Sequence, residues 1–203
     1  MMTERQTPVA ECALSLRSVA CLRGDRILFE GLSFTLGAGD AALLIGPNGA
    51  GKSSLMRQVA GLLPVSAGNI DHAGGIAFAG EAPALDQRDT LEDALAFWAR
   101  IDGGGRDAVQ RGLAAMGIEA LAQVPVRMLS TGQRKRAMLA RVIAGKAAIW
   151  LLDEPGNGLD KASLDRLSTA MADHRGRGGI VVAATHQPLG LIDPIEIALG
   201  SPS

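Results

Sequence analysis

The chain has 203 residues, of which 47% are apolar, and its formal net charge is −1 with an isoelectric point of about 6.3. This length fits one domain, or one domain with a subdomain, and is enough to bury a substantial core. The near-neutral charge excludes the basic field that nucleic-acid-binding proteins present. An aromatic content of 3%, with no tyrosine, also leaves few side chains for base stacking.

Despite a mean hydropathy of +0.19, the sequence contains no candidate membrane span. The longest apolar runs, 147–152 and 180–184, are as long as strands, whereas a spanning helix needs roughly 18 to 20 apolar residues. Residues 1–10 lack the apolar stretch of a signal peptide. We therefore expect a cytoplasmic protein. Cys12 and Cys21 have no metal-site spacing, and a reducing compartment disfavours a disulfide between them.

The pattern of apolar residues predicts an α/β fold. Near the N-terminus, 14–19 and 32–36 alternate between apolar and polar residues, which indicates an antiparallel edge sheet. Continuous apolar runs are typical of strands in a parallel sheet covered on both faces. Such runs occur at 41–45, 76–79, 148–152, 180–184 and 195–199. Residues 53–63 are expected to form a helix after the first of these strands.

The middle of the chain has helical patterns instead. A capping-box pattern begins at Thr90. Apolar residues then recur on one helical face, at Leu91, Ala94, Leu95 and Trp98. Further helices are predicted at 106–116, which Gly117 ends, and at 133–144. The expected boundaries are 1–84 and 146–203 for an α/β core and 85–145 for a helical subdomain.

A phosphate-binding loop is predicted at residues 46–53, which read Gly-Pro-Asn-Gly-Ala-Gly-Lys-Ser and fit G-x-x-x-x-G-K-S/T between a strand and a helix. Backbone N–H groups and the helix start favour a phosphate there. Lys52 would reach the β- and γ-phosphates, and Ser53 offers a hydroxyl to Mg²⁺. The expected ligands of ATP are Gly46, Pro47, Asn48, Gly49, Ala50, Gly51, Lys52, Ser53 and Ser54. The alternative is a glycine-rich turn without a ligand.

Three polar residues follow predicted buried strands. Asp153 and Glu154 end one strand, at the edge of the sheet where ligands bind. Asp153 would hold Mg²⁺, and Glu154 would accept a proton from the water that attacks the γ-phosphate. The alternative is an acidic pair that merely caps a strand. His186 follows 180–184 in the same way and is expected to contact the γ-phosphate, although a lone histidine is more often structural.

A second anion site is predicted at 129–133, Leu-Ser-Thr-Gly-Gln, where a helix begins. Ser130 and Gln133 have capping-box spacing, and Gly132 allows a close approach to the backbone. The chain already has one complete phosphate site. We therefore expect this second site to complete the nucleotide site of another molecule.

With this combination of motifs, nearly the whole chain resembles the ABC-type ATPases. The family motifs occur in order: the phosphate loop at 46–53, the signature at 129–133, Asp-Glu-Pro at 153–155, Gly-Leu-Asp at 158–160, and His186. The resemblance implies a head-to-tail homodimer with two ATP molecules at its interface. In it, Ser130 and Gly132 of one subunit touch the γ-phosphate bound to the other, and Asp160 helps to couple the two sites. It also implies transmembrane ABC subunits as partners.

Two positions depart from the family pattern. The family usually stacks adenine on an aromatic residue before the phosphate loop, where this chain has Arg23. We expect the guanidinium to lie flat on the base instead. The family glutamine that links Mg²⁺ and the attacking water to the transmembrane partner falls on Ala82. Either Glu81 or Gln87 replaces it, or the coupling is weaker.

Residues 21–34 are similar to C-x-R-x-x-R-x-L-F-x-x-L-S-F of the haem exporter ATPases of bacterial cytochrome c maturation. That resemblance implies a peripheral subunit on the cytoplasmic face of the inner membrane. There, ATP hydrolysis would serve the delivery of haem to apocytochrome c. The residues themselves show no haem site, because His72, His174 and His186 form no axial pair.

Other functions stay open at this point. An ABC exporter for a drug, lipid or peptide would have the same chemistry with different partners. A soluble ABC ATPase acting on ribosomes or in DNA repair usually has two such domains or a long coiled coil, and this chain has neither. A P-loop kinase would need an acceptor site in place of the dimer, and the helix that begins at the signature argues against it.

Overall fold

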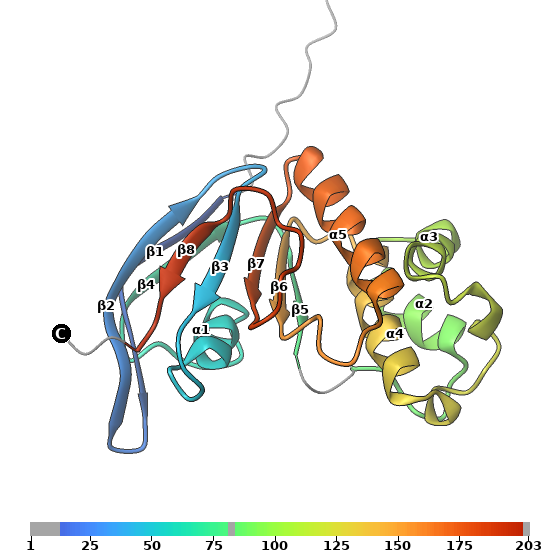
Figure 1. The fold of residues 1–203 in the computed structure, drawn as a ribbon, viewed down its shortest axis with the longest axis horizontal. Helices are drawn as coiled ribbons and strands as arrows, with labels where there is room; N and C mark the ends of the chain where they lie inside the picture. Colours follow the sequence, from blue (N-terminus) through green and yellow to red (C-terminus); the bar gives the residue numbers. More distant parts are fainter. Residues whose placement is uncertain (1–12, 81–83, 201–203) are drawn as a thin grey trace, which may run out of the picture.

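The computed structural model describes residues 13–80 and 84–200, which form two sheets and a cluster of helices (Figure 1). The interpretations of Cys12, Glu81 and Ala82 fall outside the described residues. Within the two described ranges, no helix is both long and apolar enough to cross a membrane.

The first sheet is antiparallel, as predicted, and lies on the side of the molecule away from the helical cluster (Figure 1). Its order is β2-β1-β4, with β1 at Ala13–Arg23, β2 at Arg26–Leu36 and β4 at Ala67–Ala73. Cys21 of β1 is fully buried, and burial raises the pKa of its thiol, so it acts as a packing residue. Strand β4 was not predicted from the sequence, because Ile70 is its only large apolar residue.

The second sheet is parallel, with the order β5-β6-β7-β3-β8. Its strands are β3 (Ala41–Ile45), β5 (Ile76–Ala79), β6 (Ile149–Asp153), β7 (Ile180–Ala184) and β8 (Ile195–Ala198). Strand β7 is buried along its whole length, and β6 is buried except at its last residue. This burial on both faces is what their continuous apolar sequences predict.

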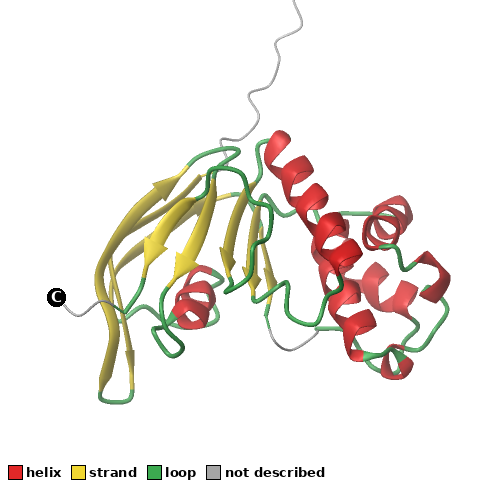
Figure 2. Ribbon diagram, viewed as in Figure 1, coloured by secondary structure: helices red, strands yellow, loops and turns green. Residues whose placement is uncertain are grey.

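Helices cover both faces of the parallel sheet (Figure 2). Helix α1 (Lys52–Val59) packs on one face with the antiparallel sheet, through residues such as Leu55. Helix α5 (Lys161–Gly176) packs on the other face, through residues such as Leu167. Helix α1 ends earlier than its sequence pattern predicts, because the chain turns at Gly61, where φ is +70°.

The helical cluster packs beside α5 (Figure 2). It contains α2 (Leu91–Ile101), α3 (Arg106–Met116) and α4 (Thr131–Ala144), with short 3₁₀ helices at Glu119–Leu121 and Val126–Met128. Thr90 caps α2 by accepting a hydrogen bond from the N–H of Asp93 (3.2 Å), and Gly117 ends α3 with φ +62°. Helix α4 begins two residues earlier than predicted. We propose 85–145 as the bounds of this subdomain, with 1–84 and 146–203 as the α/β core.

The topology brings three loops to one edge of the parallel sheet. Strands β6, β7 and β3 are neighbours and run in the same direction, so their carboxyl ends lie together. The phosphate-binding loop follows β3, Glu154 follows β6, and His186 lies just after β7. Ligands of open α/β sheets bind at this edge.

Candidate functional site

Glycines let the loop after β3 turn tightly into α1. Gly46, Gly49 and Gly51 have φ values of +142°, +81° and +103°, which side-chain-bearing residues rarely adopt. A Cβ atom at Gly51 would also lie 2.9 Å from the ring of Phe29. The loop therefore makes this tight turn without strain only with glycine at these positions.

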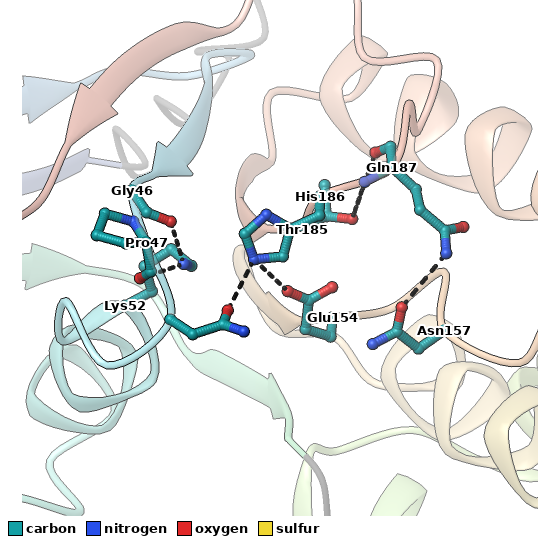
Figure 3. A network of polar contacts seen from close by, with 9 residues as sticks. Gly46, Pro47, Lys52, Glu154, Asn157, Thr185, His186 and Gln187 are labelled. Carbon is teal, nitrogen blue, oxygen red and sulfur yellow. Dashed lines mark hydrogen bonds and ion pairs between the residues drawn. The ribbon is translucent and has the colours of Figure 1, made fainter.

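Lys52, the first residue of α1, holds a buried positive charge at this loop. Lys52 is only 8% exposed. Its Nζ donates hydrogen bonds to the carbonyl oxygens of Gly46 (2.6 Å) and Pro47 (3.1 Å), as Figure 3 shows. Among the described residues it forms no ion pair. A buried ammonium held only by neutral oxygens is well placed to meet an anion.

A cavity of about 370 Å³, called the phosphate cavity from here on, is lined by residues predicted from separate motifs. Its lining residues are Arg23, Leu28, Asn48, Gly49, Gly51, Lys52, Ser53, Ser54, Asp153 and Glu154. The structure thus brings Arg23, predicted for the base, to the phosphate loop and the acidic pair. The remaining loop residues, Gly46, Pro47 and Ala50, do not line it. Leu28 does, although the sequence analysis gives it no role beyond the motif at 21–34.

Glu154 has an unusual backbone conformation. Its φ is +46°, a left-handed value that is uncommon outside glycine, and its N–H donates to the carbonyl of Ala184 (2.8 Å). Such conformations cluster at functional sites, where the surrounding structure enforces them. The bond to the end of β7 holds the Glu154 backbone beside the loop that carries His186.

His186 connects the loops after β3 and β6. Its Nε2 lies 3.2 Å from Oδ1 of Asn48 and 3.6 Å from Oε1 of Glu154 (Figure 3). In the tautomer with hydrogen on Nε2, the imidazole donates a hydrogen bond to Oδ1 of Asn48. His186 itself does not line the phosphate cavity.

A further polar contact, which the sequence analysis missed, joins the loops after β6 and β7 (Figure 3). Nε2 of Gln187 donates to Oδ1 of Asn157 (3.5 Å), and the Gln187 N–H donates to Oγ1 of Thr185 (3.0 Å). The first bond links the loop that carries His186 to the loop after Glu154, and the second lies within the loop after β7. No local pattern reveals the first bond, because Asn157 and Gln187 are 30 residues apart and both exposed.

The residues available for a metal ion fit Mg²⁺ bound together with a nucleotide. Ser53 and Asp153 line the same cavity and offer one hydroxyl and one carboxylate. Mg²⁺ in nucleotide sites takes one or two such protein ligands and completes its shell with phosphate oxygens and water. Within the described residues, no group of three or more His, Cys, Asp or Glu side chains could hold a metal ion by itself.

The signature residues lie outside this cavity. Ser130 caps α4: its Oγ accepts a bond from the Gln133 N–H (3.3 Å), and its own N–H donates to Oε1 of Gln133 (2.8 Å). The predicted capping box is therefore present. Ser130 is exposed, and neither it nor Gly132 lines the phosphate cavity. Gly132 lies against Gly158, whose carbonyl oxygen would be 3.4 Å from a Cβ at position 132.

Two other predicted residues have clear positions. Oδ1 of Asp160 caps α5 by accepting a bond from the Ser163 N–H (2.9 Å). Hydrogen bonds from Ser163 lower the pKa of Asp160. The sequence analysis missed this capping role, although the spacing of the two residues could have revealed it. Gln87, one candidate for the absent glutamine, is exposed and does not line the phosphate cavity.

Comparison with known proteins agrees with this geometry. Residues 29–157 match the family model described as ABC transporter. The chain is 53% identical to the cytochrome c biogenesis ATP-binding export protein CcmA of Sphingopyxis alaskensis, over 92% of this chain and 96% of the relative. It is 50% identical to CcmA of Zymomonas mobilis over 98% of this chain and 90% of the relative. For CcmA of Rhodospirillum rubrum the identity is 43%, over 95% and 88%.

Solved structures share the fold. A putative ABC transporter ATP-binding protein from Pyrococcus furiosus has a TM-score of 0.79 at 22% identity, covering 92% of this chain and 97% of that one. An inward-facing putative metal-chelate type ABC transporter has a TM-score of 0.78 at 26% identity, covering 93% and 79%. The chain therefore belongs to the ABC transporter family, in which it groups with the cytochrome c biogenesis ATP-binding export proteins.

Proposed function

We propose that the chain is the ATP-hydrolysing subunit of an ABC transporter complex, and that the complex exports or delivers haem during cytochrome c maturation. One observation carries the ATPase: a single cavity gathers Lys52, Ser53, Asp153 and Glu154 from two loops at the carboxyl edge of the sheet. The haem step rests on the names of the relatives and on residues 21–34, since no described histidine pair offers axial ligands.

ATP binds with its phosphates on the loop after β3. The loop N–H groups and the start of α1 attract the phosphates, and Lys52 exchanges its carbonyl partners for phosphate oxygens. Ser53 and Asp153 would hold Mg²⁺, which would supply positive charge against the charge of the phosphates. Arg23, which lines the same cavity, lies flat on the adenine.

Hydrolysis then follows from the positions of Glu154 and His186. A water molecule attacks the γ-phosphorus, its proton passes to the Glu154 carboxylate, and the bond to the β-phosphate oxygen breaks, leaving ADP and phosphate. His186 donates its Nε2 hydrogen to the γ-phosphate instead of to Asn48. Both side chains are already at this edge, so little rearrangement is needed.

A second copy of the chain completes each site. Ser130 and Gly132 sit at the start of α4, where helix N–H groups favour an anion, yet they lie outside their own phosphate cavity. In a head-to-tail homodimer they contact the γ-phosphate bound to the other subunit. Asp160 follows the segment against which Gly132 packs, and this proximity to the signature supports its role in coupling the two sites.

The remaining partners are transmembrane ABC subunits of the cytochrome c maturation system, which hold this chain on the cytoplasmic face of the bacterial inner membrane. A second cavity, of about 480 Å³, supports such a docking site. It lies between the α/β core and the helical cluster, and its lining includes Leu62, Phe78 and Trp98. Leu62 is 67% exposed, so its apolar surface is available to a partner.

The test of hydrolysis and pairing is Glu154→Gln, which removes the proton acceptor and keeps the shape. We expect this variant to bind ATP with Mg²⁺, to turn it over very slowly and to accumulate as a dimer in gel filtration. Ser130→Arg in the same background is the control, and it should bind ATP but stay monomeric. Normal turnover by Glu154→Gln would refute the role of Glu154 as the base.

The test of the partners uses the same variant. Membranes are solubilised with ATP and Mg²⁺, the tagged chain is captured, and its companions are identified by mass spectrometry, with Lys52→Ala as the control. Small multi-spanning subunits with a haem chaperone support the proposal. An unrelated permease would keep the ATPase chemistry and overturn the haem assignment. Ribosomal or DNA-repair proteins alone would overturn the transporter function.

A further inference from the structure

The chain crosses from the α/β core to the helical cluster between β5 and α2. Phe78, in β5, precedes this crossing, and Ala84 follows it. Residues 81–83 between them lie outside the described part. The backbone carbonyls of Phe78 and Ala84 nevertheless have well-defined partners, and both partners belong to the helical cluster.

The first partner is Arg141 of α4. Its Nη2 donates to the carbonyl oxygen of Phe78, which ties α4 to the core strand β5. Burial lowers the pKa of Arg141, and the nearby Asp102 carboxylate partly offsets this effect. Burying a guanidinium that bonds one backbone carbonyl costs free energy. An apolar residue would therefore be favoured at this position if the side chain only filled space.

The second partner is Trp98 of α2. Its Nε1–H donates to the carbonyl oxygen of Ala84 on the far side of the crossing. The guanidinium of Arg141 lies over the ring of Trp98, with its carbon 4.8 Å from the ring centroid. The two side chains therefore contact each other while each one holds one end of the crossing.

We propose that Arg141 and Trp98 form a clamp that positions Ser130 for its contact with the nucleotide of the second subunit. Arg141 belongs to α4 and Ser130 caps its start, and their separation of 11 positions corresponds to about 16 Å along the helix axis. Because a helix of this length moves largely as one body, holding it against β5 at Arg141 limits how its N-terminus can move relative to the core. The clamp rests on the proposed dimer, because only there does Ser130 meet a phosphate.

The clamp also faces the cavity that we assign to the transmembrane partner. Phe78, Ala84, Trp98 and Arg141 all line that cavity. A partner segment seated there touches the clamp directly. The same four residues therefore connect the docking cavity, through α4, to Ser130.

The experiment compares two clamp variants with two matched controls. Arg141→Lys keeps a charge but loses the planar fork, and Trp98→Phe keeps a ring but loses the donor to Ala84. Arg175→Lys is the matched arginine control, because Arg175 also bonds two backbone carbonyls, of Gly39 (2.8 Å) and Ile192 (2.7 Å), within the core. Trp150→Phe is the matched tryptophan control.

In ATP hydrolysis by the isolated chain, we expect each clamp variant to lower kcat about tenfold with KM within about twofold, since small displacements of a catalytic contact cost up to about a hundredfold. The binding loop lies on the core, which explains the unchanged KM. Both controls should keep kcat within about twofold. The kcat of the double clamp variant should be no lower than that of the less active single variant, because the two residues act as a unit.

Amide hydrogen exchange at residues 130–134, measured without nucleotide, tests the clamp independently of the dimer. Clamp variants should exchange faster there than the wild type, while β6 and β7 exchange at the same rate. Equal effects in the controls, faster exchange throughout the chain, or a rise in KM without loss of kcat would each overturn the clamp. If the exchange result holds but Glu154→Gln never dimerises, the proposed dimer is what fails.

Discussion

His174 makes the stability of the chain depend on pH. It lies in the last turn of α5 and is 7% exposed. Its ring stacks on Trp150 with centroids 3.9 Å apart, and its Nε2 lies 3.1 Å from the carbonyl oxygen of Ala148. Burial lowers the pKa of His174 to about 4, from an ordinary value of 6.5. The folded chain thus holds a neutral imidazole where the unfolded chain holds a charged one.

The sign and size of the effect follow from this difference. Between about pH 6.5 and pH 4 the unfolded chain binds one more proton at His174, so stability falls as the pH is lowered through this window. A difference of about 2.5 pKa units corresponds to about 3 kcal/mol once the pH is below both values. At about pH 5 the expected loss is about 2 kcal/mol, and above about pH 7 it is absent.

The assay is urea unfolding at about pH 7.5 and pH 5 for the wild type and for His174→Gln, whose amide can still donate to Ala148. Other groups titrate in both chains, so the informative quantity is the difference between their pH-dependent losses, which we expect to be about 2 kcal/mol. His72→Gln, at an exposed histidine, should behave like the wild type. Equal losses in the wild type and His174→Gln would refute the reasoning.

Two further predictions concern the nucleotide site. Ser130→Ala should cost about 1 kcal/mol of stability through the lost cap, whereas Ser130→Asp should keep the cap but repel the phosphate of the other subunit. Thermal unfolding and ATP-dependent dimerisation separate the two effects, and a stable dimer of Ser130→Asp would contradict the contact in trans. Arg23→Ala should weaken ATP binding by about 0.5 to 2 kcal/mol in calorimetry. Arg26→Ala should leave ATP binding unchanged, because Arg26 does not line the phosphate cavity. Equal affinities in both variants would exclude the stacking role of Arg23.

The sequence predicts most of the parallel sheet because the burial of a strand is reflected in its amino-acid composition. Strands β6 and β7 are buried on both faces, so nearly every residue in them is apolar. The amino-acid composition of β4 does not indicate a buried strand. It is mostly exposed, and its place is decided by pairing with β1, for example Leu16 with Ile70, rather than by its own side chains. Pairing partners distant in sequence are not visible in a local pattern.

The same distinction applies to the site. Lys52, Ser53, Asp153 and Glu154 stand at fixed distances from strand ends, so a linear motif identifies them. The Gln187–Asn157 bond and the clamp of Arg141 and Trp98 are contacts between separate elements. Their residue types are ordinary for a surface or a helix. Only the packing of α4 against α2 and β5 gives Arg141 its position.

The contacts around the cavity bear on which step limits hydrolysis. Lys52 is held by two backbone carbonyls, which are neutral acceptors that a triphosphate can displace. His186 already lies against Asn48 and Glu154 at the same edge of the sheet. The core half of the site is therefore assembled in advance, and ATP binding requires little reorganisation there. Ser130 is different, because it lies outside this cavity, and in the proposed dimer it contributes only after two chains meet. Hydrolysis should then be controlled by how α4 is presented to the second chain, and that makes the contact of α4 with the core, rather than the phosphate loop, the place where a transmembrane partner can regulate turnover.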